Sequence, residues 1–279
     1  MAARIEIASE AGACYGVERA LRMVEDAAKT STVPVHTLGP LIHNPRVVDD
    51  LAAKGVTVVA SPEDSAGDTL LLRTHGVTPE EERRARELCH DVLDATCPFV
   101  KKVHLAASRL YREGYQVVVV GEAGHPEVEA TLPHAPGAVV VGDVSKAEEL
   151  PFCKKVGVVV QTTQSRSNLQ HVVSALLDRA EEVRVINTIC DATSGHQGAC
   201  AELAARADVM IVIGGRISAN TKRLAEIAAE LCPRTYHIEG ADELDPSWLV
   251  GAGLIGITAG ASTPASQIDA VRRAIEAAI

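Results

Sequence analysis

A threefold repeat built around a cysteine constrains this 279-residue chain more than any other feature of its sequence. In each copy a short apolar run ends at a cysteine, and a helix-like segment begins there. The three cysteines are Cys14, Cys97 and Cys190. Gly121 follows Cys97 by 24 residues and Gly214 follows Cys190 by the same 24, and Gly39 stands in the matching place after Cys14. A repeat that carries one thiol in each copy predicts three thiols meeting at one point.

Apolar, strand-like runs alternate with amphipathic, helix-like runs along the whole chain, which predicts α/β modules with mainly parallel sheets. Apolar residues make up 47% of the chain and aromatic residues only 3%, so the core must be aliphatic. An aliphatic core suits parallel sheets that helices cover on both faces. Helices are expected, among other places, over 167–181 and 197–207, whereas AGHPEVE at 123–129 is expected to be a loop.

The repeat divides the chain into three quasi-equivalent modules, 14–96, 97–189 and 190–279. The N-terminal segment 1–13 precedes Cys14 as an apolar strand, so it is expected to complete the third module and close the chain into a ring. Parallel α/β sheets bind ligands at the carboxyl ends of their strands. Three modules with these ends facing inward would surround a central pocket lined by polar loops.

Charge and composition exclude several classes of protein. The net charge is −10 and neither a basic run nor an aromatic platform is present, so a nucleic-acid partner is not expected. No apolar stretch is long enough to cross a bilayer, so no membrane association is expected. The start, MAARIEIASE, is expected to be a strand and not a signal or transit peptide. Seven cysteines are an odd number, which disfavours a disulfide framework and favours a reducing, cytoplasmic location.

Each repeat cysteine is expected at the N-terminus of a helix, where unpaired N–H groups and the helix dipole stabilise a thiolate, the form that binds metal. Three thiolates allow two kinds of centre. Zinc could use three cysteines and a histidine, and an iron–sulfur cluster could use three cysteines and leave one iron open. Because the ligands are far apart in sequence and no C-x-x-C pair occurs, the pattern favours the cluster. The other four cysteines share no context and are expected to be structural.

Polar side chains follow the expected strands in all three modules. Five of them are hydrogen-bond donors beside glycine-containing loops and helix starts, which is typical of a phosphate or diphosphate site: His43, His75, Ser218, Asn220 and Ser262. A second group combines His125 with the acid Glu127 and, from another loop, the hydroxyl of Thr162. An acid and a hydroxyl beside an open iron could deliver a proton to a leaving hydroxyl.

The motifs CYGVERA, IHNPRVV, THGV, DATCPFVKKVH, AGHPEVEAT, QTTQS, TICDAT and ITAGASTP occur in the order and spacing of one known family. Over nearly its whole length the chain resembles the LytB-type 4-hydroxy-3-methylbut-2-enyl diphosphate reductases. The resemblance implies a [4Fe–4S] cluster held by Cys14, Cys97 and Cys190, and reductive removal of an allylic hydroxyl to give isopentenyl and dimethylallyl diphosphates. It implies electrons from ferredoxin or flavodoxin.

The same resemblance assigns roles to the polar residues. Glu127 matches the proton donor of the family, with Thr162 and His125 in its hydrogen-bond network. The residues implied to bind the substrate are His43, His75, His125, Thr162, Ser218, Asn220 and Ser262.

Three positions depart from the family pattern. Ala219 replaces a serine of the diphosphate site and leaves only its backbone N–H, His196 replaces an arginine, and Ala13 replaces an aromatic residue beside Cys14. Because of these changes, one alternative is that the chain is a paralogue that uses the same cluster on another allylic or aromatic alcohol. A non-catalytic iron–sulfur sensor and a zinc protein are the remaining alternatives.

Overall fold

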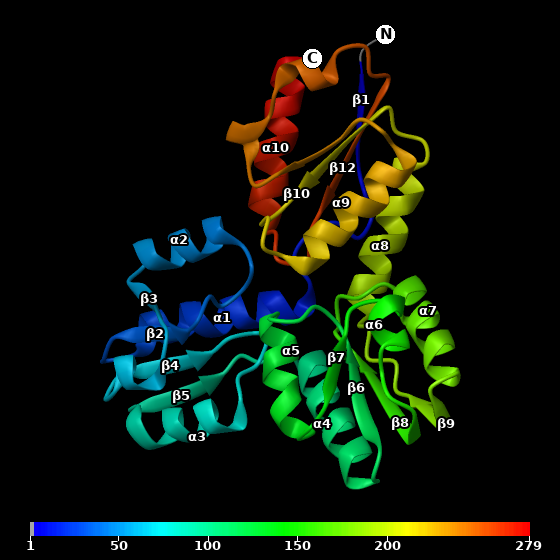
Figure 1. The fold of residues 1–279 in the computed structure, drawn as a ribbon. Coiled ribbons are helices and arrows are strands. Elements are labelled where there is room, and N and C mark those ends of the chain that lie inside the picture. Colours follow the sequence, from blue (N-terminus) through cyan, green and yellow to red (C-terminus); the bar gives the residue numbers. More distant parts are fainter. Residues whose placement is uncertain (1–2) are drawn as a thin grey trace. The chain divides into compact units, whose positions relative to one another are not determined.

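The structure is a computed structural model that describes residues 3–279, and it contains three parallel sheets of four strands each, flanked by helices (Figure 1). Every strand pairing among the described residues is parallel. The predicted fold class, three α/β modules with parallel sheets, is therefore confirmed. Residues 1 and 2, with which the predicted closing segment 1–13 begins, lie outside the described residues.

The sheet nearest the N-terminus in sequence has the strand order β3-β2-β4-β5. Its strands are β2 (Val35–Leu38), β3 (Val56–Val59), β4 (Thr69–Leu72) and β5 (Asp91–Asp94). The helices that connect them are α1 (Tyr15–Thr30), α2 (Pro45–Ala53) and α3 (Pro79–Leu88), with a 3₁₀ turn at Pro62–Ser65. Thr78 caps α3 by a capping box with Glu81, and Pro79 occupies the first helical position, so the helix begins where its sequence signals a start.

The middle sheet has the strand order β7-β6-β8-β9. Its strands are β6 (Gln116–Val120), β7 (Val139–Val141), β8 (Cys153–Val160) and β9 (Ala180–Val185). The helices around it are α4 (Pro98–Arg112), α5 (Pro126–Thr131), α6 (Val144–Glu148) and α7 (Arg166–Leu177), with a 3₁₀ turn at Leu132–His134. The two faces of β6 serve two cores: Val117 and Val119 pack with Leu110 of α4, and Val118 packs with Leu176 of α7. This alternation explains the unbroken valine run, because both faces of the strand are buried.

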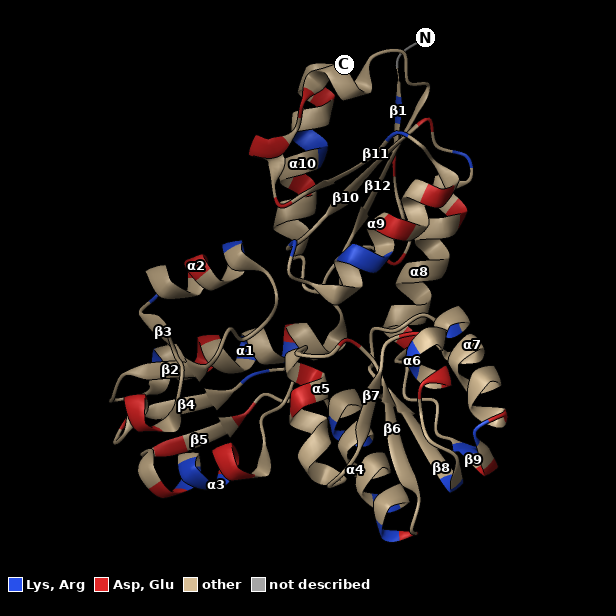
Figure 2. Cartoon of the chain, in the orientation of Figure 1, with Lys and Arg blue, Asp and Glu red and all other residues tan. Residues whose placement is uncertain are grey.

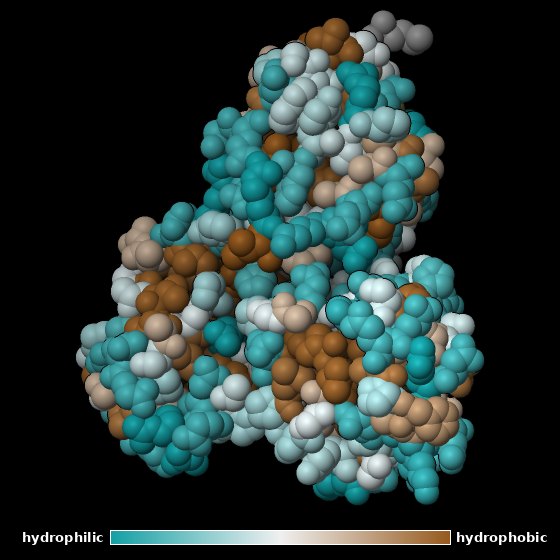
Figure 3. Space-filling view, viewed as in Figure 1, coloured by the Kyte–Doolittle hydropathy of each residue, from teal (hydrophilic) through white to brown (hydrophobic). Residues whose placement is uncertain are grey.

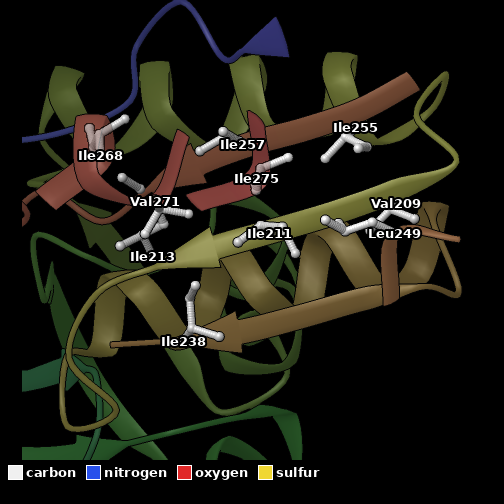
Figure 4. Packing of buried hydrophobic residues seen from close by; sticks show 11 residues of the cluster. Val209, Ile211, Ile213, Ile238, Leu249, Ile255, Ile257, Ile268, Val271 and Ile275 are labelled. Carbon is white, nitrogen blue, oxygen red and sulfur yellow. The ribbon is translucent and has the colours of Figure 1, made fainter. Parts of the chain in front are cut away.

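The third sheet has the strand order β1-β12-β10-β11, so the N-terminal strand pairs with the last strand of the chain. Its strands are β1 (Arg4–Ile7), β10 (Val209–Ile213), β11 (Thr235–Ile238) and β12 (Leu254–Ala259). Its helices are α8 (Asp191–Ala204), α9 (Ala219–Leu231) and α10 (Ala265–Ala278), with 3₁₀ turns at Ala241–Glu243 and Pro246–Leu249. Aliphatic side chains such as Ile211, Ile257 and Val271 fill the space between this sheet and α10 (Figure 4).

The chain divides into two compact units. The first comprises Met1–Glu18, His43–Asp49 and Asp191–Ile279 and contains the third sheet, and the second comprises Arg19–Ile42 and Asp50–Cys190 and contains the other two. The predicted module boundaries stay predictions. The face of the molecule drawn in Figure 3 is largely polar, with apolar side chains in smaller patches. None of the helices in residues 3–279 has the length and apolar character that crossing a membrane requires.

Three local predictions were wrong. Residues 126–131 form helix α5, not a loop, because His125 caps the turn and Pro126 starts it. Helix α7 ends at Leu177, not at 181, since β9 begins at Ala180. Helix α8 begins at Asp191, six residues before the start of the helix expected over 197–207; this start agrees instead with the helix N-terminus expected at Cys190.

Candidate functional site

Glu127 and Thr162 form a buried polar pair in the second unit. Glu127 lies on α5 and Thr162 follows the end of β8, and both side chains are buried, with 2% and 5% of their surface exposed. The Thr162 N–H donates to Oε1 of Glu127 at 2.6 Å, and the Thr162 hydroxyl lies 2.7 Å from Oε2. Burial raises the pKa of Glu127 to about 7, although both contacts with Thr162 favour the charged form. Glu127 can therefore hold a proton near neutral pH and give it up.

The contacts of His125 define which ring nitrogen carries hydrogen. His125 is the N-cap of α5, and its Nδ1 accepts a hydrogen bond from the Glu127 N–H at 3.2 Å. An imidazole that accepts at Nδ1 carries its hydrogen on Nε2, so the far side of the ring is a donor. The ring of His75 lies against it edge to face, with centroids 5.6 Å apart. Two imidazoles thus lie next to each other, and one of them, His125, is the N-cap of the helix that carries the acid.

The turn that carries His75 is fixed by its neighbours. The Thr74 hydroxyl donates to the carbonyl of Leu41 at 2.8 Å, and Gly76 adopts φ +80°. A Cβ on Gly76 would lie 2.8 Å from the His104 ring, so both the left-handed backbone and the close approach require glycine. His75 lies between these two conformationally constrained residues, which favours a preorganised position of its ring.

Cys97 and Cys190 are placed by strand ends and helix starts. Cys97 is the N-cap of α4, and its N–H donates to the Thr74 carbonyl at 2.9 Å. The Arg19 guanidinium donates to the carbonyls of Asp94 and Thr96, at 3.0 and 3.4 Å, immediately before Cys97. The N–H of Cys190 donates to the carbonyl of Thr162 at 3.2 Å. Backbone contacts therefore tie Cys97 to the His75 turn and Cys190 to the partner of Glu127.

In the first unit, Cys14 lies directly before α1. Its N–H donates to the carbonyl of Ala261 at 3.0 Å, and its own carbonyl accepts from the Glu18 N–H at 2.9 Å. The residue after Ala261 is Ser262, so the loop of the first cysteine and a predicted diphosphate-binding loop run side by side. The His196 ring is buried, with Nε2 2.9 Å from the Gly12 carbonyl and Nδ1 close to the Ala192 carbonyl.

The start of α9 carries two further predicted donors. The Ser218 hydroxyl caps the helix by accepting from the Thr221 N–H at 3.3 Å. Asn220 is 3% exposed, and neither its Nδ2 nor its Oδ1 has a hydrogen-bond partner in the part of the chain that the structure describes. A buried amide without partners costs about 1–3 kcal/mol, so a polar ligand is the natural partner here. Ala219 adds its backbone at the N-terminus of the helix, where anions bind.

His43 and Ser262 lie together in the same unit. The Ser262 hydroxyl donates to the His43 carbonyl at 3.3 Å. Asn44, which the sequence interpretation did not single out, is buried and donates to the Ser262 carbonyl at 2.9 Å and to the Gln267 side chain at 3.0 Å. The signal for it was present in the HNP motif, but only the histidine was chosen.

The predicted residues thus fall into two sets. His75, Cys97, His125, Glu127, Thr162 and Cys190 belong to the second unit, and Cys14, His43, Ser218, Asn220 and Ser262 belong to the first. Within residues 3–279 no group of three or more His, Cys, Asp or Glu side chains is arranged to hold a metal ion. The meeting of the three thiols therefore stays a prediction.

The donor set itself fits a cluster. All seven cysteines are thiols and none forms a disulfide within residues 3–279. Cys97 is followed directly by α4 and Cys190 directly by α8, the setting that lowers the cost of a thiolate. Cys200, by contrast, is buried and its thiol has a pKa raised to about 11 by burial, which suits a structural residue.

Comparison with known proteins assigns the family. The family model described as "LytB protein" matches residues 5–276. The chain is 51% identical to a 4-hydroxy-3-methylbut-2-enyl diphosphate reductase of Geobacter sulfurreducens over 273 residues, covering 98% of this chain and 96% of the relative. A reductase of the same name from Aquifex aeolicus is 46% identical over 276 residues, covering 98% and 96%.

Two solved structures agree. A structure described as (E)-4-hydroxy-3-methyl-but-2-enyl diphosphate reductase, the terminal enzyme of the non-mevalonate pathway, matches with a TM-score of 0.71 and 46% identity, covering 98% of this chain and 99% of its own. The corresponding Plasmodium falciparum reductase matches with a TM-score of 0.91 and 28% identity, covering 96% and 86%. The resemblance noted in the sequence is confirmed, and the chain belongs to the LytB protein family.

Proposed function

We propose that this chain is a 4-hydroxy-3-methylbut-2-enyl diphosphate reductase. It would replace the allylic C–O bond of its substrate by a C–H bond, with two electrons and two protons consumed and water released, to give isopentenyl and dimethylallyl diphosphates. The names of relatives that are 46–51% identical over nearly the whole chain support this reaction. The observation that carries the proposal is the buried Glu127–Thr162 pair, which would supply a proton to the leaving hydroxyl.

The proton moves from Glu127 through Thr162. When Glu127 is neutral, its carbonyl oxygen accepts from the Thr162 N–H and its hydroxyl donates to the Thr162 Oγ1. The Thr162 hydroxyl hydrogen is then available for the departing oxygen of the substrate. A pKa of about 7 makes this acid effective near neutral pH, because it is neither fully ionised nor too weak to donate.

The diphosphate is bound by hydrogen-bond donors and not by a cluster of cations. The Asn220 amide supplies a buried donor that lacks a partner within residues 3–279, and Ser218, Ser262, His43 and His75 complete the set. The positive end of the α9 dipole adds electrostatic attraction for an anion. His125, the N-cap of the helix that carries Glu127, would orient the substrate beside this acid.

Cys14, Cys97 and Cys190 are the residues we propose to hold a [4Fe–4S] cluster. When bound, the cluster supplies electrons and a Lewis-acidic iron for the allylic oxygen. We propose ferredoxin or flavodoxin as the source of those electrons and the cytoplasm as the location. The polar side chains of the site bind the diphosphate, orient the hydroxyl and deliver the proton.

The test is anaerobic product analysis. The protein, purified without oxygen, is supplied with (E)-4-hydroxy-3-methylbut-2-enyl diphosphate and dithionite-reduced methyl viologen, and the products are separated by mass. We expect both five-carbon diphosphates, and a brown protein with a visible absorption band. The phosphate-free alcohol is the control substrate. Turnover of the alcohol in place of the diphosphate would establish the paralogue, and a colourless protein containing zinc would exclude the cluster.

A further inference from the structure

Helix α4 differs in charge from every other described helix. It carries four cations, Lys101, Lys102, Arg109 and Arg112, and no carboxylate (Figure 2). No other described helix carries more than one Lys or Arg without also carrying an Asp or Glu. The whole chain has a net charge of −10, so this helix is an exception that general acidity does not explain.

The four cations lie on one exposed stripe, here called the α4 face: Lys101, Lys102, Leu105, Arg109 and Arg112. Their spacing of three, four and seven residues places them in line along the helix. Leu105 is in the middle of the stripe and is 69% exposed. An apolar side chain surrounded by cations resembles the centre and rim of a transient protein interface.

Not all of this charge is neutralised within the chain. Lys101 pairs with Asp94, and Arg109 pairs with Glu113 at 2.8 Å. Lys102 instead lies over the Phe99 ring, 4.9 Å from its centroid, and Arg112 donates to the Ser108 carbonyl at 3.4 Å. Among residues 3–279, neither Lys102 nor Arg112 forms an ion pair with a carboxylate. These two residues give the α4 face an uncompensated positive charge.

A surface pocket of about 340 Å³ lies beside the α4 face, and Lys101 and Leu105 are part of its lining. Leu105, Val77, Pro79 and His104 contribute apolar or neutral surface to its lining. Two carboxylates, Asp94 and Glu82, also line the pocket. Asp94 is paired with Lys101, and Glu82 is paired with Arg86 at 2.7 Å. A side chain of a partner protein can therefore enter the pocket without meeting an unpaired acid.

Position along the helix connects this surface to Cys97. The helix begins directly after Cys97, and Leu105 is eight residues further on, so the rise of the helix places it about 12 Å along the axis from the cysteine. The proposed reaction consumes two electrons, which a reductant must bring. We propose that the α4 face is the docking surface for an acidic electron-carrier protein of the ferredoxin type, with electrons entering at the Cys97 end. This inference rests on the proposed function.

The experiment compares Lys102→Glu/Arg112→Glu with the unchanged protein. The probe is a bacterial ferredoxin of net negative charge, and its dissociation constant is measured by calorimetry at about 0.05 M and at higher salt. We expect the double variant to bind at least about tenfold more weakly at low salt, mainly through slower association, and the difference to shrink as salt screens the charges. Anaerobic turnover driven by ferredoxin should fall in parallel.

Two further measurements distinguish a failure of the docking surface from a failure of the proposed function. Turnover driven by dithionite and methyl viologen should be unchanged in the double variant, because a small reductant does not need the α4 face. If the unchanged protein fails to reduce the diphosphate with viologen, the proposed function is wrong whatever the ferredoxin does. The matched control is Lys29→Glu/Arg273→Glu, with the same change of charge on other exposed helices. Equal losses in both double variants, or unchanged ferredoxin binding in Lys102→Glu/Arg112→Glu, would overturn the docking surface.

Discussion

His104 and His134 stack face to face, with ring centroids 4.3 Å apart and planes 20° from parallel. His104 lies on α4 seven residues after Cys97, and His134 follows α5, the helix of Glu127. His104 also contacts the Gly76 turn beside His75. One neutral ring thus touches segments that carry three different site residues.

Stability should depend on the charge of His104. Burial, and then repulsion from His134, lowers the pKa of His104 from 6.5 to about 4. Because the folded-state pKa is below the unfolded one, the unfolded chain binds more protons between these values. The contribution of the neutral His104 ring to the free energy of unfolding is fully present above pH 6.5. It is lost as the pH falls toward 4, and the loss is about 3 kcal/mol.

The substitution His104→Phe keeps a flat ring and removes this titration. Its Nε2 has no hydrogen-bond partner in residues 3–279, so no buried bond is lost. We expect the free energy of unfolding in urea to differ less between pH 7.5 and pH 5 in this variant than in the unchanged protein. His90→Gln, at an exposed position, is the control. If His104→Phe keeps the full loss at pH 5, another group is responsible.

Glu127→Gln should separate proton donation from structure. The glutamine carbonyl can accept from the Thr162 N–H and its amide can donate to Oγ1, as in the protonated acid, but no proton can be released. Turnover should fall by about 10²–10⁴-fold while diphosphate binding and cluster colour remain. Glu129→Gln, on the exposed side of the same helix, should retain activity.

The pH dependence of Glu127 has the opposite sign from that of His104. Its folded-state pKa is raised from 4.5 to about 7, so its contribution to stability is present below pH 4.5 and is lost as the pH rises through 7. The loss is on the order of 3 kcal/mol. Glu127→Gln should therefore be more stable than the unchanged protein at pH 9, and turnover of the unchanged protein should decline above pH 7. Equal stability of the two proteins at pH 9 would contradict the raised pKa.

Asn220→Ala should weaken binding without weakening the fold. The buried amide has no partner among residues 3–279, so its removal should leave the free energy of unfolding unchanged or raise it. A hydrogen bond to a charged group is worth about 1.5–3 kcal/mol, so affinity for inorganic diphosphate should fall by more than tenfold. Calorimetry and urea unfolding measure the two effects.

Asn168→Ala is the matched control for Asn220→Ala. The Asn168 amide donates to the Gly142 carbonyl at 2.8 Å and to the Gln164 side chain at 3.2 Å. This variant should lose stability and keep its affinity for diphosphate. A loss of stability in Asn220→Ala with unchanged affinity would show that Asn220 is structural.

His196 should matter for stability because both ring nitrogens face backbone carbonyls, those of Gly12 and Ala192. His196→Phe removes this polar contact from the buried ring and should cost about 1–3 kcal/mol in the free energy of unfolding. His171→Phe, at an exposed site on α7, should cost almost nothing. Unfolding in urea compares them.

The strands were predictable because their signal is local. Val117 to Val120 form an unbroken apolar run, and the two cores that bury its alternate residues require that run. Helix α5 was missed because six residues are too few to show a helical period, although His125 and Pro126 marked its start. The first turns of α8 lie outside the helix expected over 197–207 because DATSGH has no apolar stripe, and only the repeat indicated a helix start at Cys190.

The chemistry proposed for the site follows from residue types in the sequence, but its energetics do not. Glu127 and Asn220 are predicted from their motifs to be an acid and a hydrogen-bond donor, and these roles stay predictions. Neither the raised pKa of Glu127 nor the absence of a partner for Asn220 could be inferred, because each depends on what surrounds the side chain in three dimensions. Ala219 illustrates the same limit, since its backbone contributes at the start of α9 whatever its side chain.

Of the four borders between the compact units, two fall inside helices, at Glu18 within α1 and at Asp49 within α2. The other two lie between Ile42 and His43 and between Cys190 and α8. The first unit is consequently assembled from three separate stretches of polypeptide. No single gene fragment encodes this unit alone, so truncation cannot yield it in isolation. Ribosomal synthesis must also finish the last residues before the earliest strand can pair with β12, and nascent chains released early will leave that sheet open.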